Sequence, residues 1–151
     1  MNRKIISICL FIVILSVFPS ITQGEKNMRT ITYAIQYPDY NQENFGEISL
    51  ENAIKVFKTF AWDQHIRTYK EKEDAGQEAA PPNICFTDGK NNFMIWANTK
   101  HKYGIMASVP IKRLLMNSQK TLEVAPVSEA NVNMLLKAYF EGDFETIKNY
   151  K

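Results

Sequence analysis

The chain has 151 residues, of which 45% are hydrophobic and 23% are charged, with 18 Lys and Arg residues against 16 Asp and Glu residues. This length suits one domain with a core of its own. Two of the basic residues, Arg3 and Lys4, belong to a predicted signal peptide, and without them 16 basic residues balance 16 acidic ones. The composition therefore lacks the positive excess of a nucleic-acid-binding protein or a polybasic membrane-surface protein.

The first 24 residues follow the pattern of a secretory signal peptide. Two basic residues precede an apolar run over 5–18, and Thr22 and Gly24 occupy the positions of a cleavage site. The alternative is a retained membrane anchor, but the run is shorter than the roughly 20 residues that span a bilayer. We expect cleavage after Gly24, a single mature domain over 25–151, and a periplasmic or secreted location without membrane association.

The first half of the mature chain contains one predicted strand and one predicted helix. Residues 29–37 alternate between apolar and polar side chains, which predicts a half-buried strand, and residues 38–46 form a predicted polar loop. Ser49 is the predicted N-cap of a helix whose apolar residues recur at three-and-four spacing through residue 61. The charged segment 67–80 is either an exposed helical extension or a loop.

The stretch 83–110 predicts three strands joined by turns at Asp88–Gly89 and at 98–102. Successive side chains of a strand point to opposite faces of a sheet. The predicted core face carries the apolar set Ile84, Phe86, Phe93, Ile95, Ala97, Tyr103, Ile105, Ala107 and Val109. The opposite face mixes large and polar residues, namely Cys85, Thr87, Met94, Trp96, Asn98, Gly104, Met106 and Ser108.

The last third predicts a further strand over 120–127 and a helix capped by Ser128 that ends near Gly142. The apolar residues of 111–116 fit neither the helical nor the strand spacing, so this segment is ambiguous. Asp143 can cap a short last helix. The predicted fold is α+β, with an antiparallel sheet of four to five strands and two main helices packed on one face. The sequence does not define the strand order.

The sequence contains no motif for a cofactor, a metal or a catalytic nucleophile, and we predict none of the three. Cys85 is the only cysteine of the predicted mature chain, which excludes an internal disulfide, and its place inside a strand indicates an inert thiol. His65 and His101 lie far apart, without metal-ligand spacing. An alternative is a cell-envelope hydrolase that uses Asp63, His65 and Cys85, which requires these side chains to converge in one pocket.

The remaining candidate is a binding surface formed by Met94, Trp96 and Met106, with Trp62 and Asp63 as further candidates. Trp62 is otherwise an aromatic residue at the edge of the core. If the helices cover only the core face, the other three residues form an open contact patch; if a further segment covers them, the domain has three layers. On an open patch, replacement of Trp96 by alanine should leave thermal stability nearly unchanged.

The leading functional prediction is an exported, non-catalytic protein-binding module whose partner is a toxin or an enzyme. In size, export and composition it is similar to the small signal-bearing immunity or inhibitor proteins of the bacterial periplasm. The acidic residues of 71–74 could steer a basic partner. The third alternative is a small-ligand-binding or structural envelope protein, which would be indicated by a closed apolar pocket between helix and sheet. The oligomeric state is left open.

Overall fold

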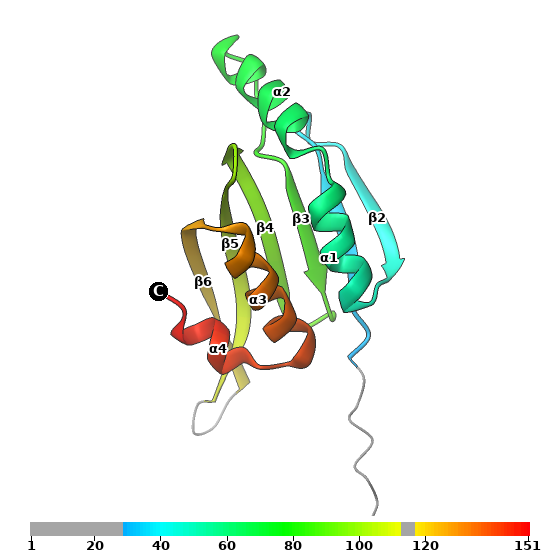
Figure 1. Cartoon of the computed structure of the whole chain (residues 1–151), viewed down its shortest axis with the longest axis vertical. Coiled ribbons are helices and arrows are strands. Elements are labelled where there is room, and N and C mark those ends of the chain that lie inside the picture. Colours follow the sequence, from blue (N-terminus) through cyan, green and yellow to red (C-terminus); the bar gives the residue numbers. More distant parts are fainter. Residues whose placement is uncertain (1–28, 113–116) are drawn as a thin grey trace, which may run out of the picture.

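The computed structural model describes residues 29–112 and 117–151, and these form an α+β fold. It has one six-stranded antiparallel sheet and four helices (Figure 1). The elements in chain order are β1 (Thr32–Gln36), β2 (Gln42–Glu47), α1 (Leu50–Thr59), α2 (Trp62–Asp74), β3 (Asn83–Thr87), β4 (Asn92–Thr99), β5 (Lys102–Lys112), β6 (Asn117–Val127), α3 (Glu129–Glu141) and α4 (Phe144–Asn149). The predicted signal peptide lies outside the described residues.

The strands follow the order β2-β1-β3-β4-β5-β6, and every neighbouring pair is antiparallel. The expectation of four to five strands was wrong, because β2 occupies most of the predicted polar loop 38–46 and extends to Glu47. All six residues of β2 are exposed, since this strand lies at the edge of the sheet and pairs only with β1. Such a strand has no apolar face and so lacks the alternation that identified the others. In the ambiguous segment 111–116, β5 continues to Lys112, and residues 113–116 lie outside the described part.

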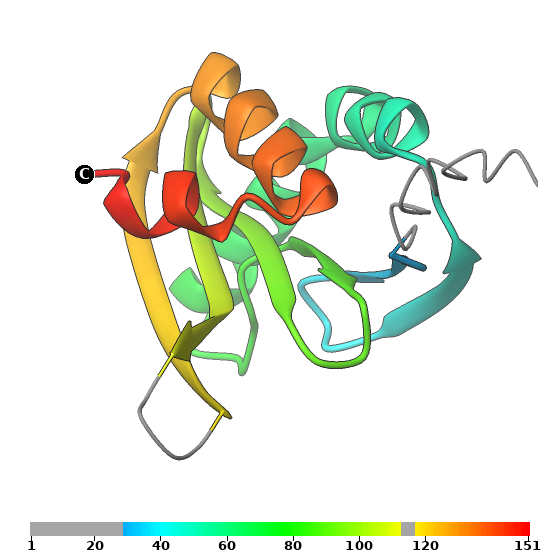
Figure 2. The ribbon, with the colours of Figure 1, turned by 90° about the horizontal axis from the view of Figure 1, so that it is seen from below.

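The helices are arranged asymmetrically about the sheet. The sheet curves around α1, α3 and α4, which lie on one face, while α2 projects past the ends of the strands (Figures 1 and 2). No helix built from the described residues lies over the opposite face, which we call the far face and which carries Cys85, Met94, Trp96 and Met106. Within the same residues, no helix combines the length and apolar character needed to cross a bilayer.

The core lies between the sheet and the helices. All nine residues of the predicted core face are buried, so the predicted alternation of β3, β4 and β5 is confirmed. The helices contribute Phe57 of α1 and Leu135, Leu136 and Tyr139 of α3. Burial of this apolar area is the main favourable term in folding.

The helix boundaries follow the predicted capping residues. The Ser49 hydroxyl oxygen accepts a hydrogen bond from the Asn52 backbone N–H at 3.3 Å, and Ser128 accepts one from the Asn131 N–H at 3.4 Å. Gly142 ends α3 with φ of 74°, a left-handed conformation that suits glycine. In the segment 67–80, residues 67–74 are helical and belong to α2, a separate helix that begins at Trp62, whereas residues 75–80 form a turn and a loop.

Candidate functional site

Met94, Trp96 and Met106 lie together on the far face. Met94 of β4 pairs directly with Met106 of β5, and Trp96 pairs with Gly104 two positions along. Side chains of directly paired residues lie on the same face, at a spacing that allows contact. All three large side chains are half-buried. The structure thus brings the predicted patch together on adjacent strands, on the face that α1, α3 and α4 leave uncovered (Figure 2).

The Trp96 ring lies directly over the Gly104 backbone. A Cβ atom added at Gly104 would overlap Cε2, Cζ2 and Nε1 of the indole. Gly104 is itself buried although it faces the uncovered side, because the ring shields it. Only glycine permits so close an approach of a ring to a strand. The strand alternation predicts that Gly104 lies on this face, but nothing in the local sequence indicates that it positions Trp96.

Trp62 is placed away from this patch. Only 7% of its surface is exposed, its ring centroid lies 5.4 Å from that of Tyr103, and its indole N–H donates a hydrogen bond to the Phe57 carbonyl at 2.9 Å. These contacts place Trp62 in the core at the junction of α1 and α2.

Asp63 lies next to Trp62, on the surface. Its carboxylate forms an ion pair with the Lys100 ammonium group at 2.7 Å, and this hydrogen bond lowers the pKa of Asp63. Asp63 and Trp62 line a depression of about 470 Å³ together with His101, Tyr103 and Glu129. The structure therefore separates the five predicted binding residues into a far-face group of three and an end-of-sheet group of two.

The structure does not bring Asp63, His65 and Cys85 together, because Asp63 lines the depression at the end of the sheet and Cys85 lies in the middle of the sheet. The His65 ring packs against Phe60, with 4.8 Å between ring centroids, and burial lowers its pKa. Cys85 pairs with Ala34 and Met94 in the middle of the sheet, and burial raises the pKa of its thiol, which opposes thiolate formation. The geometry provides no shared pocket for the hydrolase alternative. Within 29–112 and 117–151, no three His, Cys, Asp or Glu side chains are grouped so that they could hold a metal ion.

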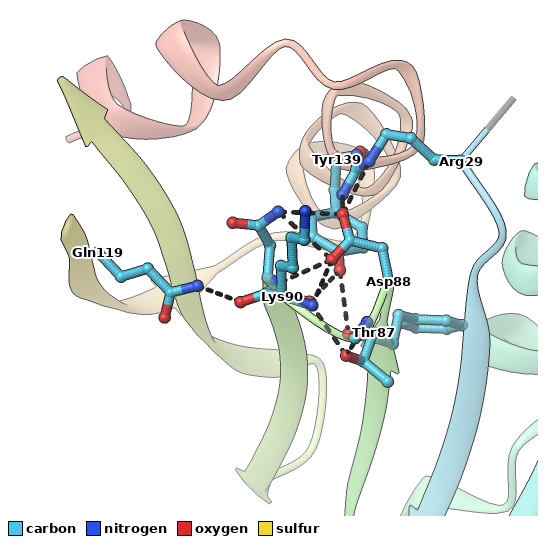
Figure 3. Close-up of polar contacts among 9 residues, drawn as sticks. Arg29, Thr87, Asp88, Lys90, Gln119 and Tyr139 are labelled. Atoms are coloured by element: carbon cyan, nitrogen blue, oxygen red, sulfur yellow. Dashed lines mark hydrogen bonds and ion pairs between the residues drawn. The ribbon is translucent and has the colours of Figure 1, made fainter. Parts of the chain in front are cut away.

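An ion-pair cluster that no local sequence pattern predicts joins the start of the described chain to the β3–β4 turn and to α3 (Figure 3). The Arg29 Nε–H donates a hydrogen bond to Asp88 Oδ2 at 2.9 Å, and its Nη1 donates to the Tyr139 carbonyl. The guanidinium carbon also lies 4.8 Å from the ring centroids of Tyr139 and Phe144. Arg29 is thereby fixed by charge, hydrogen bonds and cation–π contact at once.

The Asp88 carboxylate is fully used within this cluster. Besides Arg29, it accepts hydrogen bonds from the backbone N–H groups of Lys90 and Asn91 and from the Asn91 side chain. Partial burial alone would raise the pKa of Asp88, but these hydrogen bonds outweigh it and lower the pKa to about 2. A carboxylate with all its acceptor positions occupied serves to hold the turn, so we assign the cluster a structural role.

A second depression lies on the far face, beside the Met94–Trp96–Met106 patch. It has a volume of about 330 Å³ and spans β2, β1, β3 and β4. Its lining consists of Thr32, Tyr33, Ala34, Gln36, Gln42, Asn44, Phe45, Asn83, Cys85, Thr87 and Met94. None of these side chains carries a charge at neutral pH. The far face therefore combines an aromatic and methionine patch on β4 and β5 with an amide-rich hollow on β1, β2 and β3.

Comparisons of the chain with family models, with curated proteins and with solved structures found no match.

Proposed function

We propose that the chain is an exported, non-catalytic module that binds another protein through the far face, in the manner of an inhibitor or immunity protein directed at an enzyme or a toxin. The observation that carries this proposal is the placement of Met94, Trp96 and Met106 on the sheet face that α1, α3 and α4 leave uncovered. Export to the periplasm or beyond is inferred from the signal-peptide pattern of the first 24 residues.

The chemistry of these three side chains suits a protein interface. Tryptophan offers a large rigid contact area, and methionine adapts its shape to a partner, so both are enriched where proteins meet. The Trp96 ring is also preorganised, because it lies on the Gly104 backbone. A side chain that is already fixed loses less conformational entropy on binding, which favours affinity.

The charged helix α2 supplies a second element of the proposed mechanism. Glu71, Glu73 and Asp74 are exposed near its C-terminal end, where the helix projects past the sheet (Figure 1). Acidic side chains in this position raise the rate of encounter with a basic partner. Mutation of these three residues to neutral ones should slow association at low salt and leave the dissociation rate nearly unchanged.

The test is capture of a partner from an envelope extract with immobilised wild-type protein and three variants. Trp96→Ala and Met106→Ala should lose the partner, whereas Met134→Ala should retain it. Met134 is the matched control, because it is an exposed methionine on the helical layer, with 44% of its surface accessible. Equal capture by all four proteins would contradict the proposal.

The Trp96 variant needs a folding control. The structure changes the expectation that its loss leaves stability nearly unchanged, because the ring is half-buried and covers Gly104. We expect Trp96→Ala to lower the free energy of unfolding by about 1–2 kcal/mol, compared with about 3–5 kcal/mol for alanine at the fully buried Phe93. If Trp96→Ala remains folded at the assay temperature and still fails to capture the partner, the change in the binding surface causes the loss, and unfolding does not.

A further inference from the structure

The amide side chains of the far-face depression form two hydrogen-bonded pairs. The Asn83 side-chain N–H donates to Gln36 Oε1 at 3.1 Å, and the Gln42 side-chain N–H donates to Asn44 Oδ1 at 2.8 Å. Each pair uses one amide NH₂ group and one amide oxygen. The Gln36 NH₂ and the Asn83 oxygen, like the Asn44 NH₂ and the Gln42 oxygen, have no hydrogen-bond partner in the part of the chain that the structure describes. The depression thus presents fixed donors and acceptors side by side.

The lining selects against charged ligands. None of its eleven side chains is ionised at neutral pH, so a bound carboxylate, phosphate or ammonium group would lose its hydration without gaining a counter-charge. A hydroxyl group suits such a lining, because each hydroxyl can both donate and accept a hydrogen bond. Thr32 adds a hydroxyl group to the lining, whereas the Thr87 hydroxyl already donates to the Asn91 carbonyl and accepts from the Gly89 N–H. A volume of about 330 Å³ is within the range of pockets that bind small ligands.

Trp96 provides an aromatic surface at the border of the depression. It pairs directly with Asn83, which lines the depression, and its ring lies over the Gly104 backbone. The electron-rich face of an indole attracts the slightly positive C–H groups of an aliphatic ring. An amide-lined hollow beside a fixed indole can therefore bind the hydroxyl edge and the C–H face of a sugar at the same time.

We propose that this depression binds a neutral oligosaccharide. An extended peptide also carries donors and acceptors, but it would pair with the free backbone edge of a strand such as β2. Here the available groups are side-chain amides on the face of the sheet, and those of Gln36 and Asn83 lie on the inner strands β1 and β3 and not on the edge strand β2, which favours a sugar over a peptide. The proposal adds a ligand to the protein-binding function, and its site shares Met94 and Trp96 with the protein-binding patch while its amide side chains lie on β1, β2 and β3.

The test is a titration of the isotopically labelled protein, monitored by NMR, with cellotetraose, maltotetraose and chitotetraose as probes. At least one probe should shift the side-chain amide signals of Gln36, Gln42, Asn44 and Asn83 in a saturable way. Asn83→Ala should weaken that binding by about tenfold or more. The change removes the Asn83 oxygen, which would accept a hydrogen bond from the sugar, and it removes the N–H donor that holds the Gln36 side chain in place. A neutral tetrapeptide with acetylated and amidated ends is titrated in the same way, to represent peptides as the competing class of ligand.

Two further variants keep the outcome clear. Gln42→Ala should also weaken sugar binding and should not disturb folding, because β2 is fully exposed. Gln77→Ala changes an exposed amide in the loop after α2 and should have no effect. No saturable shift with any of the three sugars, shifts with the peptide alone, or unchanged affinity in Asn83→Ala and Gln42→Ala would overturn the proposal. Because Gln42→Ala should still capture the protein partner, the two proposals can fail separately.

Discussion

The indole of Trp96 and the backbone of Gly104 are in direct contact across β4 and β5, and there is no room between them for a Cβ atom. This contact fixes the largest side chain of the far face. Because the ring rests on a strand and not on other flexible side chains, its orientation depends on one glycine. The proposed binding surface therefore depends on Gly104, although glycine has no side chain that a partner could contact.

Replacement of Gly104 by alanine should displace the Trp96 ring. We expect the free energy of unfolding to fall by about 1–3 kcal/mol, as for other overpacked sites, and the tryptophan emission to shift to the red as the ring enters solvent. Trp62 remains buried and provides the constant part of the signal. The matched control is Gly46→Ala, where an added Cβ would meet nothing within 4 Å. Equal spectra for the two variants would contradict the contact.

The Asp88 carboxylate should make stability depend on acid pH. Its pKa is about 2 in the folded protein and near the ordinary 3.8 in the unfolded chain, so the unfolded state binds its proton first as the pH falls. The stabilisation is fully present above about pH 4 and is lost as the pH falls through about 2, with a total of about 2 kcal/mol. Asp88→Asn should flatten the curve of unfolding free energy against pH in this window.

The control for that curve is Asp74→Asn, at the exposed end of α2. Urea unfolding at half-unit pH steps from 2 to 6 measures both variants beside the wild type. A wild-type slope that persists in Asp88→Asn would show that other carboxylates cause it.

Arg29 should not tolerate replacement by lysine. Its guanidinium group binds the Asp88 carboxylate and the Tyr139 carbonyl and lies over two aromatic rings, whereas an ammonium group cannot make these planar contacts together. We expect Arg29→Lys to lower the free energy of unfolding by about 1–2 kcal/mol and to increase amide hydrogen exchange in α4. Arg67→Lys, at an exposed position of α2, is the control. The same loss in both variants would contradict the role of the cluster.

Export should leave a shortened protein. If the first 24 residues are a signal peptide, the protein recovered from the cell envelope or the medium begins at Glu25, and its intact mass corresponds to residues 25–151. Intact mass spectrometry of the native protein measures this directly. The full-length mass in the cytoplasmic fraction alone would contradict export.

The sequence predicted the features that depend on local pattern. The alternation from Ile84 to Val109 identified the buried face of three strands, and Ser49, Ser128 and Gly142 marked helix ends, because each of these signals lies within a few neighbouring residues. The strand β2 was missed because an exposed edge strand has no apolar face to reveal it.

Features that depend on pairing between distant segments could not be predicted. Arg29 and Asp88 are 59 positions apart, and nothing in either local sequence indicates the other. The register of β4 and β5 had to be known before Gly104 could be placed beneath Trp96. The sequence left Trp62 open between a binding surface and the edge of the core, and the packing of α2 on Tyr103 of β5 buries it. Strand order and side-chain contacts of this kind are set by the whole fold and not by a motif.

The most direct test of the far face as a protein-binding surface is site-specific photo-crosslinking in cells. A photoreactive amino acid in place of Met106 on the far face is compared with the same residue in place of Met134 on the helical layer. We predict a discrete crosslinked product from position 106 that is absent from position 134 and disappears when Trp96→Ala is added. A product from position 134 alone, with none from position 106, would contradict the assignment of the binding surface to the far face.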